Sequence, residues 1–236
     1  MEGFDIKIAG HAARVRPLFS STRDYCARYL TEDVPEAIIT VSQEDLQAQQ
    51  QALFEEALRE GLRPRTFTDP FLERTVIQEK LAAHLSRYDI FPFHGSAIAA
   101  DGVGYLFTAD TGTGKSTHTR LWRQLLGERA VMINDDKPFL QITEDGAVVH
   151  GSPWSGKHGL DTNIAVPLGG ICILERGEED RIWRISPEEA MPQLRKQAGG
   201  ADPRLLDRLG ERVRLWHLCC TATVHAAEVA FQAMGR

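Results

Sequence analysis

A glycine-rich segment in the middle of the chain constrains the fold more than any other feature. The apolar run from Tyr105 to Thr108 is typical of a strand, and the next residues, Ala109 to Ser116, read Ala-Asp-Thr-Gly-Thr-Gly-Lys-Ser. A helix is expected to begin at the end of that loop. Strand, glycine-rich loop and helix are the three parts of a phosphate-binding P-loop. The sequence therefore predicts an α/β protein with a nucleotide phosphate site.

The residue types in this loop suit phosphate chemistry. Gly112 and Gly114 let the backbone turn its N–H groups inward, because no Cβ interferes. These N–H groups and the positive end of the following helix attract the β- and γ-phosphates, while Lys115 adds a charge and Ser116 offers a hydroxyl to Mg²⁺. Ala109 departs from the strict pattern, which has glycine there, and a helix-capping loop with an exposed lysine is the alternative. The predicted nucleotide-binding residues are Ala109, Asp110, Thr111, Gly112, Thr113, Gly114, Lys115, Ser116 and Thr117.

Two adjacent carboxylates, Asp135 and Asp136, follow the apolar run Val131–Ile133. Ligand sites of open α/β sheets lie at the carboxyl ends of strands, where an acidic residue commonly holds Mg²⁺. A second carboxylate can accept the proton of an acceptor hydroxyl, since two close like charges raise one pKa. The alternative is a solvated Asn-Asp-Asp turn before a proline. His94, between aromatic residues, is by itself more typical of a structural histidine.

The first 90 residues carry no recognisable chemistry and are predicted to form a small N-terminal α/β region. Ile6–Arg16 and Ala37–Val41 are expected as short strands, and Leu46–Glu60 as a helix with one apolar stripe. Asp69 is expected to cap a second helix with Pro70 at its first position. Residues 91–236 form the predicted nucleotide-binding catalytic domain.

Two hairpins are predicted in this second region. Asp101-Gly102 lies between Ser96–Ala100 and Gly104–Thr108, and Asp145-Gly146 lies between Phe139–Thr143 and Ala147–His150. Aspartate-glycine between two such runs is a strong signal for a tight hairpin turn. The remaining predicted elements are buried central strands at Val131–Ile133 and Gly170–Leu174, helices opening with a capping box at Ser186–Glu189, at Asp202-Pro203 and at Thr223, and a strand at Val213–Leu218.

Charge and composition exclude several partner classes. The formal net charge of −6 argues against a nucleic-acid surface, and no apolar run approaches the ~18 residues of a membrane span. The start of the chain lacks the regions of a signal peptide, so a cytoplasmic location is expected. The four cysteines show no CxxC pair or metal-ligand spacing: Cys26, Cys172, Cys219 and Cys220. Three of them lie in apolar contexts, so reduced cysteines with a structural role are expected.

The combination of His94-Gly95, a hairpin, Ala109–Ser116 and then Asp135-Asp136 resembles the catalytic domain of HPr kinase/phosphorylases. It is also similar to the nucleotide core of phosphoenolpyruvate carboxykinases, which share that fold. The resemblance spans roughly residues 91–174 and is greatest to small HPr-kinase-like proteins, some of which phosphorylate a serine of a precursor peptide. It implies that Lys115 contacts the phosphates and that His94 assists the base. It also implies Asp135 as the base and Asp136 as a metal or acid/base partner, with their order open.

Other polar residues are weaker candidates. The loop Gly151–Gly159 contains Trp154, Lys157 and His158 and is either an acceptor or γ-phosphate element or a surface loop around a packed tryptophan. Lys137 and Arg120 are further cations near the phosphates in sequence, although Arg120 is more typical of a surface arginine.

The expected function is an ATP- and Mg²⁺-dependent kinase. The acceptor hydroxyl belongs to a Ser or Thr of a peptide or protein, or to a small molecule, and GTP is an alternative to ATP. Ser116 and Asp136 are the expected metal ligands. The alternatives are a carboxykinase-like lyase and a regulatory or scaffolding module that binds nucleotide without transfer. No nucleic-acid or membrane partner is expected, and a homo-oligomer is left open.

Overall fold

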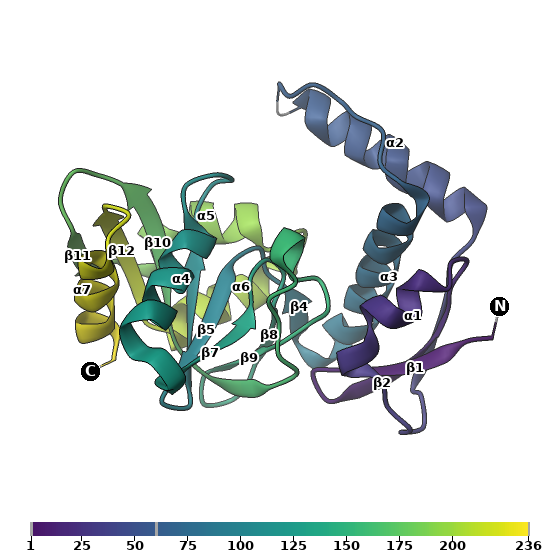
Figure 1. Cartoon of the computed structure of the whole chain (residues 1–236), viewed down its shortest axis with the longest axis horizontal. Coiled ribbons are helices and arrows are strands. Elements are labelled where there is room, and N and C mark those ends of the chain that lie inside the picture. Colours follow the sequence, from purple (N-terminus) through teal and green to yellow (C-terminus); the bar gives the residue numbers. More distant parts are fainter. Residues whose placement is uncertain (1, 60, 236) are drawn as a thin grey trace. The chain divides into compact units, whose positions relative to one another are not determined.

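The computed structural model of the chain describes residues 2–59 and 61–235. The fold is mixed α/β, as predicted, and the chain divides into two compact units, Met1–Arg87 and Tyr88–Arg236 (Figure 1). No helix among the described residues is long and apolar enough to cross a bilayer.

The N-terminal unit combines a small sheet with helices. β1 pairs antiparallel with β2, which pairs parallel with β3. The single strand predicted over Ile6–Arg16 is wrong, because Ala9 and Gly10 both have positive φ, 50° and 86°, and reverse the chain between β1 and β2. The elements are β1 (Phe4–Ile8), β2 (His11–Arg16), α1 (Ser21–Tyr25), η1 (Ala27–Tyr29), β3 (Ala37–Thr40), α2 (Gln43–Arg59) and α3 (Asp69–Leu85).

Both long helices of this unit were predicted, with small differences at their ends. α2 begins three residues before the predicted Leu46, and the predicted last residue, Glu60, lies outside the described residues. Asp69 is the first residue of α3 and not its cap, because Thr68 has the extended backbone of an N-cap. The apolar positions Leu72, Val76 and Leu81 of α3 are buried.

The C-terminal unit contains a nine-stranded sheet. Seven strands follow the order β4-β8-β9-β10-β6-β5-β7, and the other two are β12, which pairs with β10, and β11, which pairs with β12. Its strands are β4 (Ile90–Pro92), β5 (Ser96–Ala100), β6 (Val103–Thr108), β7 (Ala130–Asn134), β8 (Phe139–Ile142), β9 (Ala147–His150), β10 (Ala165–Arg176), β11 (Arg181–Arg184) and β12 (Leu215–Cys220). Its helices are α4 (Lys115–Leu126), η3 (Gly127–Arg129), η4 (Gly156–His158), α5 (Pro187–Gln197), α6 (Pro203–Arg212) and α7 (Val224–Met234).

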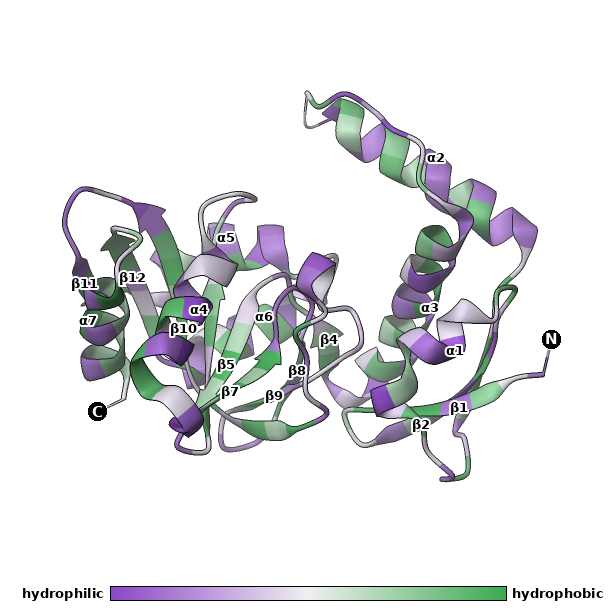
Figure 2. Cartoon of the chain, viewed as in Figure 1, coloured by the Kyte–Doolittle hydropathy of each residue, from purple (hydrophilic) through white to green (hydrophobic). Residues whose placement is uncertain are grey.

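Helices cover both faces of this sheet (Figure 1). Leu106 of β6 and Ile171 of β10 face the side covered by α5 and α6, whereas Phe107 and Cys172, the next residue of each strand, face α4 and α7. The alternation follows from the two-residue period of a strand. Hydrophobic residues accordingly follow the strands at the centre of this unit (Figure 2). Three layers with two hydrophobic cores result.

Most predicted elements of this unit are confirmed. The β5–β6 and β8–β9 hairpins form as predicted, with Asp101 and Gly102 at φ 51° and 83° in the first turn. The capping box of α5 is present, and α6 and α7 follow Asp202 and Thr223. The segment Gly170–Leu174 lies inside the central strand β10. β4 and β11 were not predicted, and β12 begins two residues after the predicted Val213.

Val131–Ile133 was expected in a buried central strand, and this is wrong. These residues form β7, which lies at one end of the strand order beside β5, and the Val131 side chain is 41% exposed. Residues 132–134 are buried nonetheless. Strand order depends on long-range pairing, which an apolar run does not encode.

The strand directions bring several loops to one edge of the sheet. β10 is parallel to β6 and to β12, and β5 is antiparallel to both β6 and β7. Strands β6, β7, β10 and β12 therefore all run the same way, and their carboxyl ends share one edge. That edge also receives the residues just before β5. The glycine-rich loop, the aspartate pair and His94 are the segments that meet there.

Candidate active site

The glycine-rich loop connects β6 to α4, in the predicted order of strand, loop and helix. Gly112 and Gly114 adopt φ values of 82° and 125°, which other residues rarely do. A Cβ at either position would meet nothing within 4 Å, so these positions require glycine for its backbone conformation and not for space. Gly114 is the N-cap of α4 and provides no side-chain cap, which leaves the first N–H groups of the helix for a ligand.

Lys115 folds back over the loop. Its side chain is buried, and Nζ donates a hydrogen bond of 2.9 Å to the carbonyl oxygen of Ala109, the first residue of the loop. Burial lowers the pKa of Lys115, and the negative charges of Asp136 and Asp110 oppose that shift. The ammonium group thus lies within the electrostatic reach of both the loop and the aspartate pair.

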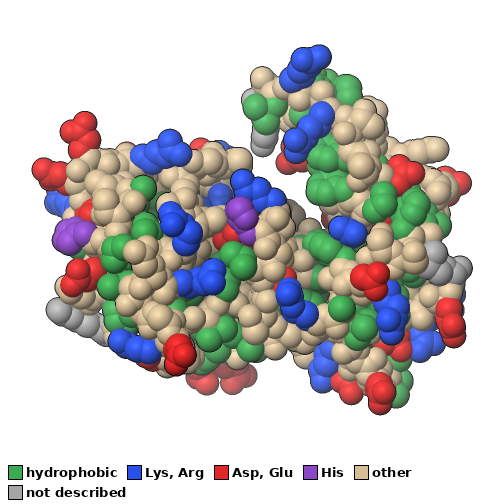
Figure 3. Space-filling model, in the orientation of Figure 1, with side chains coloured by type: hydrophobic (Ala, Val, Ile, Leu, Met, Phe, Trp, Pro, Cys, Tyr) green, Lys and Arg blue, Asp and Glu red, His purple; other side chains and the backbone are tan. Residues whose placement is uncertain are grey.

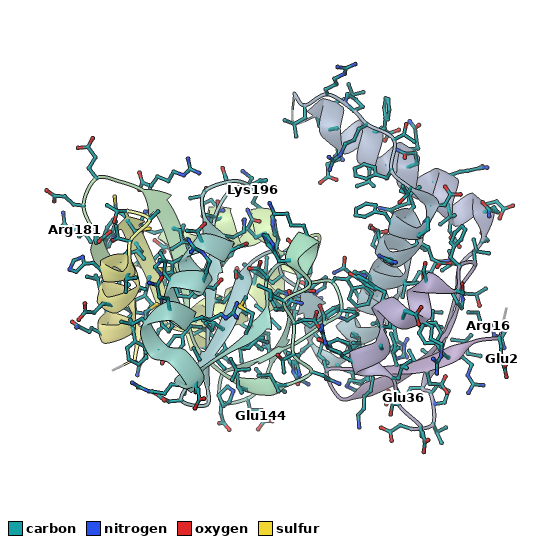
Figure 4. The ribbon with its side chains drawn as sticks, in the orientation of Figure 1. Glu2, Arg16, Glu36, Glu144, Arg181 and Lys196 are labelled. Atoms are coloured by element: carbon teal, nitrogen blue, oxygen red, sulfur yellow. The ribbon has the colours of Figure 1, made fainter. Side chains whose placement is uncertain are left out.

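Side chains from α5 and from the end of β10, both distant in sequence, form hydrogen bonds with the glycine-rich loop. Lys196 and Gln193 of α5 donate to Asp110 Oδ1 over 2.7 and 3.3 Å, and Lys196 is labelled in Figure 4. The Lys196 hydrogen bond, followed by that of Gln193, lowers the pKa of Asp110. Arg176, at the end of β10, donates to the carbonyl oxygens of Gly112 and Thr113. These three residues were not predicted, because nothing in the loop motif points to them.

Asp135 is anchored inside the protein. Its Oδ1 accepts a hydrogen bond of 2.7 Å from Ser96 Oγ, which lies 2.8 Å from Thr119 Oγ1 of α4. Its backbone N–H donates to the carbonyl oxygen of Leu160 over 3.1 Å. Ser96 and Thr119 are buried, and Asp135 is 7% exposed. The Asp135 carboxylate therefore connects β5 with the first turns of α4.

Asp136 has a different environment. Its side chain is 37% exposed, and Oδ1 lies 3.4 Å from His94 Nε2. Burial raises the pKa of Asp136, and the charges of Lys137 and Lys115 limit that rise. Burial lowers the pKa of His94 to about 4, with Lys137 and Lys115 acting in the same direction. At neutral pH the imidazole beside the Asp136 carboxyl group is therefore uncharged.

Asn134 shapes the turn that presents Asp136. Its Oδ1 accepts hydrogen bonds from the N–H groups of Asp136 and Lys137, at 2.8 and 2.7 Å, while its Nδ2 donates to Ser152 O and Oγ. Asn134 is fully buried, so this polar network has no competition from solvent. The asparagine belongs to the predicted turn, but its bonds to Ser152 are visible only in the structure.

The loop Gly151–Gly159 lies directly against this turn. Lys137 N–H donates to Trp154 O over 3.0 Å, and a Cβ on Gly156 would come within 3.2 Å of Asp136 Cβ. Trp154 is buried, as the surface-loop alternative expected, whereas Lys157 and His158, which follow Gly156, are exposed. Several lysine and arginine side chains are exposed on the visible face of this unit, some of them next to a histidine (Figure 3). Arg120 is exposed on α4.

A dedicated metal cage is not found among residues 2–59 and 61–235, where no group of three or more His, Cys, Asp and Glu side chains is placed to hold an ion. Magnesium shared with a phosphate chain keeps several waters and needs one or two protein oxygens. Ser116, exposed at the start of α4, and the aspartate pair meet that lower requirement.

Comparisons with known proteins give a distant similarity to solved structures and nothing nearer. No family model matches the chain, and no curated protein matches it. Among solved structures the chain is similar to the Hpr(Ser) kinase/phosphatase from Coxiella burnetii, at 10% identity and a TM-score of 0.37. That match covers 60% of this chain and 95% of the other. A similarity at this level does not assign an activity.

Proposed function

We propose that the C-terminal unit is an ATP- and Mg²⁺-dependent kinase that transfers the γ-phosphate to a hydroxyl group. The observation that carries the proposal is that the loop after β6 and the aspartate pair after β7 share one edge of the sheet, because β6 and β7 run in the same direction. There Lys115 Nζ donates to Ala109 O of the loop, and the charges of both aspartates act on it. Nucleotide binding alone requires the loop and its lysine. A carboxylate beside an uncharged histidine suits a proton acceptor for the transfer step.

The proposal assigns the base to Asp136, the reverse of the order implied by the family resemblance. Asp135 is hydrogen-bonded to Ser96 and almost fully buried, whereas Asp136 is accessible and contacts His94. In the reaction the acceptor oxygen forms a bond to the γ-phosphorus, and the bond from that phosphorus to the leaving ADP oxygen breaks. The hydroxyl proton goes to the Asp136 carboxylate. His94 orients that carboxylate without adding a charge.

Asp135 then takes the role of metal ligand that was predicted for Asp136. Ser96 and Thr119 connect Asp135 to α4, the helix that carries Ser116, so both candidate ligands are fixed to one rigid element. Magnesium, when bound, neutralises charge on the β- and γ-phosphate oxygens. Ser116 and Asp135 would hold it, directly or through water.

The test uses the whole chain with γ-labelled ATP, Mg²⁺ and pools of metabolites and of peptides containing Ser or Thr. Transfer of label to a phosphoester supports the kinase. Nucleotide-dependent release of CO₂ from oxaloacetate would replace it with the lyase. Tight ATP binding without either product, over a broad set of acceptors, would replace it with the regulatory module.

Two matched variants then distinguish the aspartates. Asp136→Asn should lower kcat by about 10²–10⁴-fold with little change in ATP affinity, because an amide cannot accept the proton. Asp135→Asn should instead raise the Mg²⁺ concentration needed for half-maximal rate. Asp145→Asn, in the β8–β9 turn, is the control. If Asp135→Asn lowers kcat and Asp136→Asn raises the Mg²⁺ requirement, Asp135 is the base and Asp136 the metal ligand. Wild-type rates in both variants would show that neither aspartate takes part in the mechanism.

Nucleotide binding has its own test. Lys115→Ala removes the ammonium while leaving the loop backbone, so the affinity for ATP should fall by more than about tenfold in calorimetric titration. Arg120→Ala, an exposed position on the same helix, should bind ATP like the wild type. Unchanged affinity in the Lys115 variant would contradict the assignment of the phosphate site.

A further inference from the structure

The outer side of the glycine-rich loop is held by a guanidinium group. Arg176 Nε donates to the carbonyl oxygen of Thr113 over 3.1 Å, and Nη2 donates to that of Gly112. Arg176 is the last residue of β10, a central strand of the sheet. Its backbone position is therefore fixed by pairing on the sheet, and its forked side chain reaches two successive carbonyl groups.

These two contacts fix the directions of the peptide N–H groups. A trans peptide is planar, and the N–H of each residue points opposite to the carbonyl of the residue before it. With the Gly112 carbonyl turned toward Arg176, the Thr113 N–H points away and donates to Asp110 O over 3.2 Å, which closes the turn. With the Thr113 carbonyl turned the same way, the Gly114 N–H also points away from Arg176, toward the inner side of the loop.

A glycine-rich loop needs such a restraint. Gly112 and Gly114 have wide conformational freedom, so their peptide groups can reorient with little steric cost. The bonds to Arg176 oppose that reorientation. Among the residues that the structure describes, no carboxylate forms an ion pair with Arg176, so its charge also adds to the positive potential around the loop.

We propose that Arg176 is a positioning residue of the phosphate site: it holds the Gly112 and Thr113 carbonyls outward so that the Gly114 N–H faces the phosphate chain of a nucleoside di- or triphosphate. The inference rests on the proposed nucleotide binding. It assigns Arg176 no contact with the reacting atoms.

The variants are Arg176→Ala and Arg176→Lys, with Arg181→Ala on β11 as the control. Affinities for ATP, ADP and AMP are measured by calorimetry. Arg176→Ala should lower the affinities for ATP and ADP by about tenfold to 100-fold, because charge-assisted hydrogen bonds that orient the loop are lost. The affinity for AMP, which lacks the β-phosphate, should change by less than about threefold. Lysine cannot supply the fork, so Arg176→Lys should restore only part of the affinity.

A readout independent of nucleotide follows the loop itself. The amide resonance of Gly114 in the nucleotide-free protein should shift in Arg176→Ala and stay unchanged in Arg181→Ala, and millimolar guanidinium should move it back. An unchanged Gly114 resonance would overturn the proposal, as would equal losses for ATP, ADP and AMP together with a lower melting temperature. If wild-type protein does not bind ATP, the proposed function fails, while the Gly114 resonance still decides whether Arg176 orients the loop.

Discussion

Replacing His94 with glutamine should make the C-terminal unit less sensitive to acid. In the folded protein, burial and the charges of Lys137 and Lys115 lower the pKa of His94 from 6.5 to about 4. Between those values the unfolded chain binds a proton that the folded chain does not. The stabilising contribution of the uncharged imidazole is therefore fully present above pH 6.5 and is lost as the pH falls toward 4.

The size of the effect follows from these two pKa values. Lowering the pH from about 7 to about 5 protonates His94 in the unfolded state but leaves it largely uncharged in the folded state, which costs about 2 kcal/mol of unfolding free energy. The His94 side chain is only 25% exposed, so screening by solvent reduces this cost little. The glutamine variant has no titrating group and should lose about 2 kcal/mol less than the wild type over the same interval.

Urea unfolding followed by tryptophan fluorescence measures the unfolding free energy of the C-terminal unit. All four tryptophans lie within residues 88–236: Trp122, Trp154, Trp183 and Trp216. Wild type, His94→Gln and the control His158→Gln are compared at both pH values, and His158 is an exposed residue of η4. The control should keep the wild-type dependence. Equal losses in wild type and His94→Gln would refute the reasoning, as would an NMR titration of the His94 ring with a midpoint near 6.5.

Two further substitutions test the loop and the anchored aspartate. Gly114→Ala places a side chain at φ 125°, so calorimetry should show a loss of ATP affinity, whereas wild-type affinity would mean that the loop tolerates another backbone conformation. Ser96→Ala removes the 2.7 Å donor of Asp135 and should lower the unfolding free energy in urea by about 1–3 kcal/mol, because a buried carboxylate oxygen loses its partner. A change below about 0.5 kcal/mol would show that the Asp135 carboxylate finds another donor.

Local signals were sufficient for the hairpin β5–β6 and for the order of strand, loop and helix around Gly112 and Gly114. Each depends on residues that are close in sequence, such as Asp101-Gly102, whose preferred backbone angles determine the turn. The capping box at Ser186 is equally local. Local signals failed at Ala9-Gly10, where the chain reverses although the alternation of apolar residues continues on both sides of the turn.

The sequence by itself determined which side chains carry the candidate chemistry: Lys115 in its loop, His94, and the pair Asp135 and Asp136 after a strand. Only the tertiary structure decided their environments. It buries Asp135 against Ser96, leaves Asp136 accessible beside His94, and brings Arg176 and Lys196 to the loop from 63 and 86 positions away. The physical reason is that burial and hydrogen-bond partners depend on which strands and helices pack together. Residue periodicity and turn propensity describe only neighbours along the chain.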